Sequence, residues 1–301
     1  MGIRVLCIGD VMLDVITKIS VMPADIHYGS DTPSTISTHG GGAAGNVASW
    51  LTRTTATSTI LGHVGDDAAG AALVSEFDSL GVLHNNLVVD HGSSGVVVVL
   101  VDPTGERTMF PDNGANAGLH IGDLPSLDTF DVVYLSGYSP LDPLSRPGVM
   151  QMIAKIREAN LPIYFDPASV GAMMQVPIDE VKSWIRLINI IVLNEEESIY
   201  LTGETDPEKA IEVLLHDCEG VVIKRGSLGA IGKARGSLLI SVPALATEVV
   251  DTTGAGDSFA AGFIAEYAIS KNMQQSLEAG ARTAARCVAI VGARPRVGTV
   301  I

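Results

Sequence analysis

The feature that most constrains the fold is an alternation of short apolar runs with longer helical stretches along most of the chain. Several runs are apolar at every position, as in strands of a parallel sheet that is covered on both faces. The predicted strands are Ile3–Ile8, Thr57–Leu61, Val132–Leu135, Pro162–Phe165, Ile188–Leu193 and Val221–Ile223. Helices are predicted at 43–53, 67–80, 146–159, 178–186, 195–202, 207–216, 257–270 and 274–291. This order predicts an α/β protein with a doubly wound, mainly parallel central sheet flanked by helices.

Two stretches interrupt this alternation. Residues 12–38 are rich in Thr, Ser, Ile and turn residues, and residues 94–110 read as a hairpin that turns at Asp102–Gly105. We expect them to form a small β-sheet lid from about 12–38 and 94–112, with a free face that pairs with a second subunit. An antiparallel extension of the central sheet is the alternative. A chain of 301 residues could form one large α/β domain or two smaller ones, and we expect one domain over residues 1–301.

Bulk composition narrows the choice of partner and compartment. The chain has 19 basic and 34 acidic residues and a net charge of −15, which argues against nucleic acid or an anionic membrane as partner. No apolar run approaches the roughly 18 residues that cross a bilayer. The N-terminal segment reads as a strand and not as a secretory signal. Three separated cysteines, Cys7, Cys218 and Cys287, fit the reduced thiols of a cytoplasmic protein.

The segment Asp251-Thr-Thr-Gly-Ala-Gly-Asp257 carries the clearest chemistry. Its glycines can turn the backbone so that adjacent amides point at one spot, directly before a predicted helix. The positive end of a helix favours a developing anion there, and Asp257 in the first turn could accept a proton from a hydroxyl. The alternative is a turn into a buried helix with Asp257 as a cap.

Further candidates follow other predicted strands. Asp10 and Asp14 come after the first strand, at the edge where open α/β sheets bind ligands, although either could be a structural cap. The glycines of His39–Ala48 let a ligand lie close to the backbone, and Asn46 can donate and accept hydrogen bonds, which suits a polyol; a tight loop is the alternative.

Two segments suit a metal–nucleotide complex. The acidic run Asn194-Glu-Glu-Glu197 could hold Mg²⁺ through water or could complement the helix dipole. The run Lys224–Gly229 offers positive charge and two glycines for phosphate or ribose, with a surface turn as the alternative. Neither a P-loop nor a Gly-x-Gly-x-x-Gly after the first strand is present.

In this order, the motifs resemble those of the ribokinase-like (PfkB-type) carbohydrate kinase family over nearly the whole chain. The matching segments are Gly9-Asp10 through Asp14, Gly41-Gly42 with Asn46, Val64-Gly65-Asp66-Asp67 with Gly70, Gly81-Val82, Gly114-Ala115-Asn116, Asn194 with Glu197, and Asp251–Asp257. The resemblance implies a small β lid and ATP-dependent phosphorylation of a hydroxymethyl group on a sugar or nucleoside. Lid closure would exclude water.

The resemblance also implies roles for residues. Asp257 would be the base, and the amides of Gly254, Ala255 and Gly256 would form the anion hole. Sugar hydroxyls would be bound by Asp14, Gly41, Gly42 and Asn46. Asn194 and Glu197 would organise Mg²⁺ and its waters, while Lys224, Gly226 and Gly229 would sit by the nucleotide. Many members also bind a monovalent cation, which here would be potassium held by Asp251, Thr253 and carbonyls near Cys287 and Gly292.

Two positions depart from ribokinases. Arg296 stands where a small polar residue is common, and an arginine there disfavours potassium unless it points away. Ala43-Ala44 stand where Lys-Gly is common, which argues against ribose itself.

Three functions remain open from the sequence. A sugar kinase leads, with Arg107 either selecting an acidic or phosphorylated sugar or lying in solvent. A nucleoside kinase would need an apolar slot for the base, for which Tyr28, Met109 and Phe110 are candidates. A non-catalytic sugar or nucleotide sensor is disfavoured by the intact Asp257, and a homodimer through the lid is expected.

Overall fold

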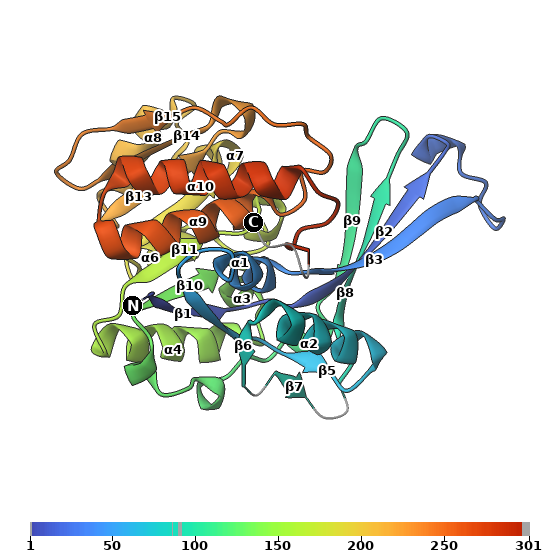
Figure 1. Cartoon of the computed structure of the whole chain (residues 1–301), viewed down its shortest axis with the longest axis horizontal. Coiled ribbons are helices and arrows are strands. Elements are labelled where there is room, and N and C mark those ends of the chain that lie inside the picture. Colours follow the sequence, from blue (N-terminus) through green and yellow to red (C-terminus); the bar gives the residue numbers. More distant parts are fainter. Residues whose placement is uncertain (1, 86, 90–91, 297–301) are drawn as a thin grey trace.

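The computed structural model describes residues 2–85, 87–89 and 92–296, which form a nine-stranded sheet with helices on both faces and a second, smaller sheet (Figure 1). The sequence-based range 1–301 also includes residues 1, 86, 90–91 and 297–301, which lie outside the described residues.

The central sheet has the strand order β15-β14-β13-β12-β11-β10-β1-β4-β6. The strands from β13 to β6 are parallel, whereas β14 and β15 extend the sheet in antiparallel fashion. Their bounds are β1 Arg4–Ile8, β4 Thr57–Leu61, β6 Leu83–His84, β10 Val132–Ser136, β11 Ile163–Asp166, β12 Ile190–Asn194, β13 Gly220–Lys224, β14 Ala230–Ala234 and β15 Ile240–Val242. The predicted strands are confirmed with small shifts at their ends; β6, β14 and β15 were not predicted.

Both faces of the sheet are buried, as the apolar strands indicated. In β1, Val5 and Cys7 pack into one core, while Leu6 and Ile8 pack into the other. The first core is covered by α1 Ala43–Leu51, α2 Ala68–Leu80, α9 Ala255–Ser270 and α10 Met273–Val288. The second is covered by α4 Arg146–Glu158, α6 Ile178–Ile185, α7 Glu195–Thr202 and α8 Pro207–Leu214. This arrangement is the predicted doubly wound fold.

Some helix bounds differ from the prediction for local reasons. The last helix was expected to reach residue 291 but α10 ends at Val288, and the chain then turns through Gly292, whose φ is +91°. That turn lets the Gly292 N–H reach Asp251 Oδ2 at 3.0 Å. Two short helices were not predicted, α3 Tyr138–Leu141 and α5 Val170–Met173.

The four-stranded small sheet projects from the body beside α1 and α2 (Figure 1). Its order is β3-β2-β8-β9, with β2 Met12–Ile19, β3 Ser34–Gly41, β8 Gly95–Val101 and β9 Arg107–Asp112. The predicted hairpin turn is present, since Gly105 N–H donates to the Asp102 carbonyl at 3.0 Å. A further pair, β5 Val64–Gly65 and β7 Val88–Val89, is parallel. The two interrupting stretches therefore form a separate sheet and do not extend the central one.

The two faces of the small sheet carry different residues. Asp14 pairs with Val97 and Arg107 pairs with Val101, so both side chains lie on one face. Val98 pairs with Val15 and Phe110 on the opposite face. On that opposite face, which we call the outer face, Ile36, Val98 and Phe110 are 62%, 39% and 55% exposed.

The three cysteines, Cys7, Cys218 and Cys287, are buried and unpaired. Burial raises the pKa of each thiol, so all three stay protonated at neutral pH. Among the helices of the described residues, none has both the length and the apolar character needed to cross a membrane.

Candidate active site

The residues of the candidate site, predicted or not, gather at the carboxyl edge of the central sheet. Asp166, Asn194 and Lys224 are the last residues of β11, β12 and β13, and Asp10 follows β1. Because parallel strands end at one edge, residues far apart in the sequence come together there.

The phosphate side is the start of α9. Gly254 caps the helix with φ +75°, and a Cβ there would lie 2.7 Å from Ala293, so a glycine is required by both conformation and space. Over the described residues, the N–H groups of Gly254, Gly256 and Asp257 have no protein acceptor, whereas Ala255 N–H donates to the Thr252 carbonyl at 3.2 Å. Three amides at a positive helix end are therefore available to an anion.

Asp257 lies in the first turn of α9 and is joined to α1. The Asn46 amide Nδ2 donates to Asp257 Oδ2 at 2.8 Å. Burial raises the pKa of Asp257 to about 7, and the negative charge of Asp166 adds to the shift, while the Asn46 bond and Lys224 oppose it. A carboxylate with a pKa near 7 is matched to general-base chemistry at neutral pH.

A buried cation stands beside the glycine turn. Lys224 Nζ donates to Asp166 Oδ2 at 2.7 Å, with only 15% and 8% of the two side chains exposed. A Cβ on Gly256 would lie 3.1 Å from that Nζ, so the ammonium group borders the amides of the α9 turn. The carboxylates Asp166 and Glu197 raise the pKa of Lys224 above its usual range despite burial, which keeps it charged.

Asn194 and Glu197 form a reciprocal cap at the start of α7. Glu197 N–H donates to Asn194 Oδ1 at 2.8 Å, and both Glu197 oxygens accept from Asn194, at 2.8 and 2.6 Å. The structural alternative for this pair, helix capping, is therefore present. Glu197 is also 3% exposed, and burial together with Asp166 raises its pKa to about 8.

Three carboxyl groups, Asp166, Glu197 and Asp257, lie around the ammonium group of Lys224, so their full ionisation would leave an excess of negative charge. A divalent cation would offset this excess of negative charge, so the donor set fits Mg²⁺. No cluster of three or more His, Cys, Asp or Glu within residues 2–85, 87–89 and 92–296 is arranged to hold a metal by itself. The carboxyl groups suit an ion that keeps several of its waters.

The opposite side of the site is formed by β2 and the glycine loop. Asp14 is 9% exposed, and burial raises its pKa to about 6 while Arg294 opposes the shift. A Cβ on Gly41 would lie 2.2 Å from Asp14 Oδ1, so the carboxylate rests directly on the glycine backbone. Gly42 caps α1 with φ +84°. Asp10 accepts from the Ala43 N–H and from Ser136 Oγ, both at 2.7 Å, so its two oxygens hold the loop.

Sequence reasoning missed the ion pair of buried Arg294 and partly buried Glu76 that supports this side. Arg294 Nη1 donates to Glu76 Oε2 and Nη2 donates to the Gly41 carbonyl, both at 2.6 Å. Its Nε donates to Asn46 Oδ1 at 3.3 Å, which orients the amide that contacts Asp257. Asp166 was missed too, although it follows a predicted strand as Asp10 does. Glu76, in the middle of α2, carries no sequence signal.

The predicted cation ligands contact the small sheet instead. Arg107 Nη2 donates to Asp251 Oδ1 at 2.5 Å, and Nη1 donates to Thr253 Oγ1. Hydrogen bonds from Thr253 and Gly292 and the charge of Arg107 lower the pKa of Asp251 to about 2. The residues present therefore do not fit a potassium ion in this arrangement. The Arg296 backbone carbonyl accepts from Arg53 Nη2 at 3.0 Å.

The nucleotide-side glycines follow β13. Gly226 and Gly229 have φ +55° and +88°, and a Cβ on Gly229 would lie 2.0 Å from the Val242 carbonyl. They form the turn between β13 and β14 beside Lys224. The antiparallel extension of the sheet thus borders the site.

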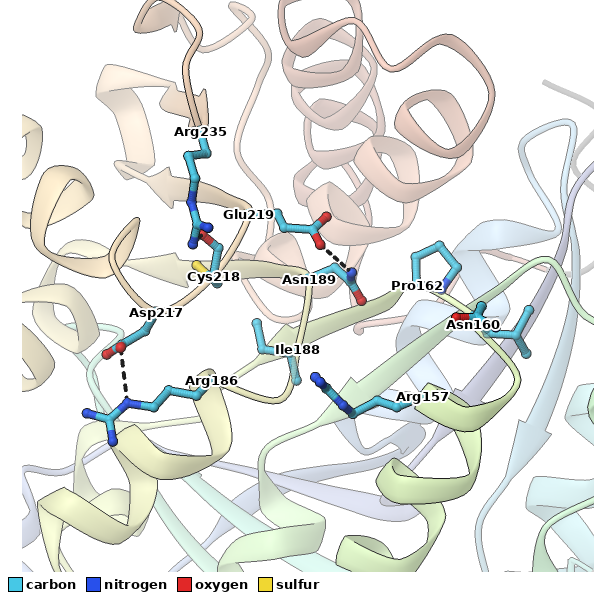
Figure 2. Close-up of a pocket in the computed structure, with 11 residues that line it drawn as sticks. Arg157, Asn160, Pro162, Arg186, Ile188, Asn189, Asp217, Cys218, Glu219 and Arg235 are labelled. Atoms are coloured by element: carbon cyan, nitrogen blue, oxygen red, sulfur yellow. Dashed lines mark hydrogen bonds and ion pairs between the residues drawn. The ribbon is translucent and has the colours of Figure 1, made fainter.

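A pocket of about 370 Å³ lies at the other edge of the sheet, before β11, β12 and β13 (Figure 2). Its arginines are engaged with neighbouring groups: Arg157 Nη1 donates to the Leu187 carbonyl, Arg235 Nη2 to the Cys218 carbonyl, and Arg186 Nε to Asp217. This edge carries none of the predicted site residues, so we place the site at the carboxyl edge.

Comparisons with known proteins agree with this architecture. The family model described as pfkB family carbohydrate kinase matches residues 3–297. An ATP-dependent ribose-1-phosphate kinase of Halopiger xanaduensis is 29% identical, over 94% of this chain and 93% of its own. Adenosine kinase from Sinorhizobium meliloti superposes with a TM-score of 0.86 at 23% identity, over 98% of this chain and 96% of its own. A putative ribokinase II from E. coli, in complex with ATP and Mg²⁺, superposes with a TM-score of 0.84 at 22% identity. The match covers 97% of this chain and 94% of the other.

The fold and these relatives define a small-molecule kinase, a phosphotransferase with an alcohol group as acceptor. The chain belongs to the pfkB family of carbohydrate kinases.

The raised pKa of Asp257 predicts a pH-dependent stability. Its folded-state pKa, about 7, lies above the unfolded value near 3.8, so the folded state binds the proton more tightly. The stabilisation is complete below about pH 4 and is lost as pH rises through 7. Asp257→Asn, which needs no proton, should exceed the wild type in free energy of unfolding by about 4 kcal/mol at pH 8 and nearly match it at pH 4. Urea unfolding at both pH values measures this.

The control is Asp128→Asn, which changes an exposed carboxylate. Its difference from the wild type should not vary between pH 4 and 8 by more than about 0.5 kcal/mol. A constant difference for Asp257→Asn across this range would contradict the raised pKa.

Proposed function

We propose that this protein is an ATP-dependent kinase that phosphorylates a primary hydroxyl of a sugar or sugar derivative. The observation that carries the proposal is the 2.8 Å hydrogen bond between Asn46 and Asp257. It joins the glycine loop, suited to a polyol, to the amides of α9, suited to a phosphate. One carboxylate thus lies where an acceptor hydroxyl and a phosphoryl group would meet.

In the proposed mechanism Asp257 is the base. It takes the proton from the acceptor hydroxyl as that oxygen bonds to the γ-phosphorus and the bond from phosphorus to ADP breaks. The amides of Gly254, Ala255 and Gly256 form the anion hole, with Ala255 N–H leaving its weak bond to Thr252. Lys224, beside Gly256, adds positive charge where the transferred group gains negative charge.

The acceptor lies on the Asp14 side. Asp14 and Asn46 bind its hydroxyls, and Gly41 and Gly42 let it approach the backbone. Asp10 contributes by holding the loop through Ala43 and Ser136. Arg107 lies on the same face of the small sheet as Asp14 and limits the site at that end.

The nucleotide lies on the Lys224 side. It is bordered by Asn194, Lys224, Gly226, Gly229 and Thr253. Glu197 would hold Mg²⁺ through water. When bound, Mg²⁺ would neutralise the phosphate oxygens and the leaving group. The ATP and Mg²⁺ named for the E. coli structure and the ATP named for the Halopiger relative support these cofactors.

We propose that residues 1–301 form one domain, with 12–38 and 94–112 as the lid. The exposed apolar outer face of the lid supports a homodimer, in which a second copy covers Ile36, Val98 and Phe110. Three unpaired thiols support a cytoplasmic location.

A nucleoside kinase is the second candidate, favoured by the likeness to the adenosine kinase structure. Met109 lies on the Asp14 face of the lid and is 58% exposed, so it is placed to contact a base. Phe110 lies on the outer face, so it does not contribute to an apolar slot for a base on the Asp14 face. A sensor without catalysis would not need the raised pKa of Asp257.

Asp257 should be required for fast phosphorylation of the acceptor. A panel of sugars and nucleosides with ATP and Mg²⁺ should show turnover of a sugar, measured as ADP release and a phosphorylated product. Asp257→Asn should lower kcat on that acceptor by about 10²–10⁴-fold, because the base is lost, with nucleotide affinity retained. Asp128→Asn should be fully active. A nucleoside preference would favour the second candidate, and turnover unaffected by Asp257→Asn would exclude this mechanism.

A second prediction separates the two sides of the site. Gly41→Ala places a methyl group against Asp14 and should raise KM for the acceptor at least about tenfold, equivalent to roughly 1.4 kcal/mol, with KM for ATP unchanged. Gly171→Ala adds the same methyl group where no atom lies within 4 Å and should leave both constants unaltered. An equal rise in KM for both substrates would argue against an acceptor site at Asp14.

The lid dimer is tested by charge insertion. Phe110→Glu on the outer face should convert the dimer to a monomer in light scattering, because a charge would be buried in the interface. Leu144→Lys, which changes a residue that is 71% exposed on the body, should remain dimeric. A monomeric wild type at working concentration would remove the dimer from the proposal.

A further inference from the structure

Arg107 reaches from the lid to the loop before the anion hole. It is the first residue of β9, and its guanidinium contacts Asp251 and Thr253, about 145 residues later in the chain. Thr253 directly precedes Gly254, the cap of α9. The arginine therefore joins the lid to the turn that carries the proposed anion-hole amides.

The Asp251 carboxylate has no oxygen left without a donor. Oδ1 accepts from Arg107 Nη2 at 2.5 Å, from Thr253 N–H at 2.9 Å and from Thr253 Oγ1 at 2.6 Å. Oδ2 accepts from Gly292 N–H at 3.0 Å. Thr253 Oγ1 in turn accepts from Arg107 Nη1 while it donates to Asp251. One side chain thus supplies a positive charge to Asp251 and a hydrogen-bond donor to Thr253, two of the predicted cation ligands.

The exposure of the pair fits a lasting contact. Arg107 is 25% exposed and Asp251 is 10% exposed, so the charges are partly shielded from solvent. The guanidinium binds two acceptors at once with its planar fork. The C-terminal loop is held by the same carboxylate through Gly292.

We propose that Arg107 is the resident cation of this loop: its guanidinium replaces a monovalent metal ion at Asp251 and Thr253 and positions the anion-hole turn when the lid lies over the site. Arg107 is a positioning residue in this role. Two of its five N–H groups are engaged by Asp251 and Thr253, so this role requires no contact with an acidic acceptor. The catalytic part rests on the proposed kinase function.

The experiment compares wild type with Arg107→Met and Arg107→Lys in choline chloride, KCl and guanidinium chloride at equal low millimolar concentrations. Each is assayed for kcat, for KM of both substrates and for melting temperature without substrates. The control is Lys18→Met. Lys18 and Arg107 both pair with Val101, so the control removes a charge from the same row of the lid, where Lys18 is exposed.

The wild type and the control should show the same kcat in choline and in KCl. Arg107→Met should lose about 10²-fold in kcat in choline, because the turn is misplaced, with smaller changes in KM. Potassium or guanidinium should raise the kcat of Arg107→Met at least tenfold above its value in choline. Either cation should raise the melting temperature of this variant alone. Arg107→Lys should retain an intermediate kcat, since it keeps the charge without the fork.

Strong activation of the wild type by potassium would overturn the proposal, as would an Arg107→Met variant that keeps full kcat in choline. A loss that neither cation restores, in kcat or in melting temperature, would also overturn it. If the wild type phosphorylates nothing in the panel, the proposed function fails. The melting temperatures then still decide whether Arg107 replaces a cation.

Discussion

The hydrogen bond between Asn46 and Asp257 is the interaction on which the site depends. It joins α1 to α9, two helices that cover the same face of the sheet. The two bonded residues are more than 200 positions apart in the sequence. Because Asp257 stands at the start of α9, the bond sets the distance between the glycine loop and the amides of that helix. Arg294 orients the side-chain amide of Asn46. The amide oxygen accepts from the Arg294 guanidinium, so the amide nitrogen faces the Asp257 carboxylate.

The C-terminal loop connects parts that the central sheet alone would leave apart. Gly292 contacts Asp251, while Arg294 contacts Gly41 and Glu76. The Trp50 indole N–H also donates to the Ala293 carbonyl at 2.8 Å. Consecutive residues of one short loop thus hold the phosphate turn, the acceptor loop and α1. A buried guanidinium in such a loop requires complete pairing, and Glu76 supplies the opposite charge.

Much of the fold was predictable because burial on both faces leaves uninterrupted apolar runs, as in β1 and β12. The antiparallel strands β14 and β15 were not, since Ala230–Ala234 mixes Gly232 and Lys233 with apolar residues. The candidate site was predictable where residues follow strands or glycine turns, as for Asp257, Asn194 and Lys224. Arg294 and Glu76 escaped because their pairing is a long-range contact between a loop and the middle of a helix. The contact of Arg107 with Asp251 likewise depends on where the lid lies.

The buried carboxyl group of Glu197 also binds a proton at neutral pH. With a pKa of about 8, Glu197 is largely protonated at neutral pH although the positive charge of Lys224 opposes the shift. A divalent cation arriving with a nucleotide would favour the ionised form, so the proton must leave as the complex forms. Binding and proton release are then linked, and the apparent affinity for the metal–nucleotide complex rises as the solution becomes more alkaline. The heat of binding would accordingly vary with the ionisation enthalpy of the buffer.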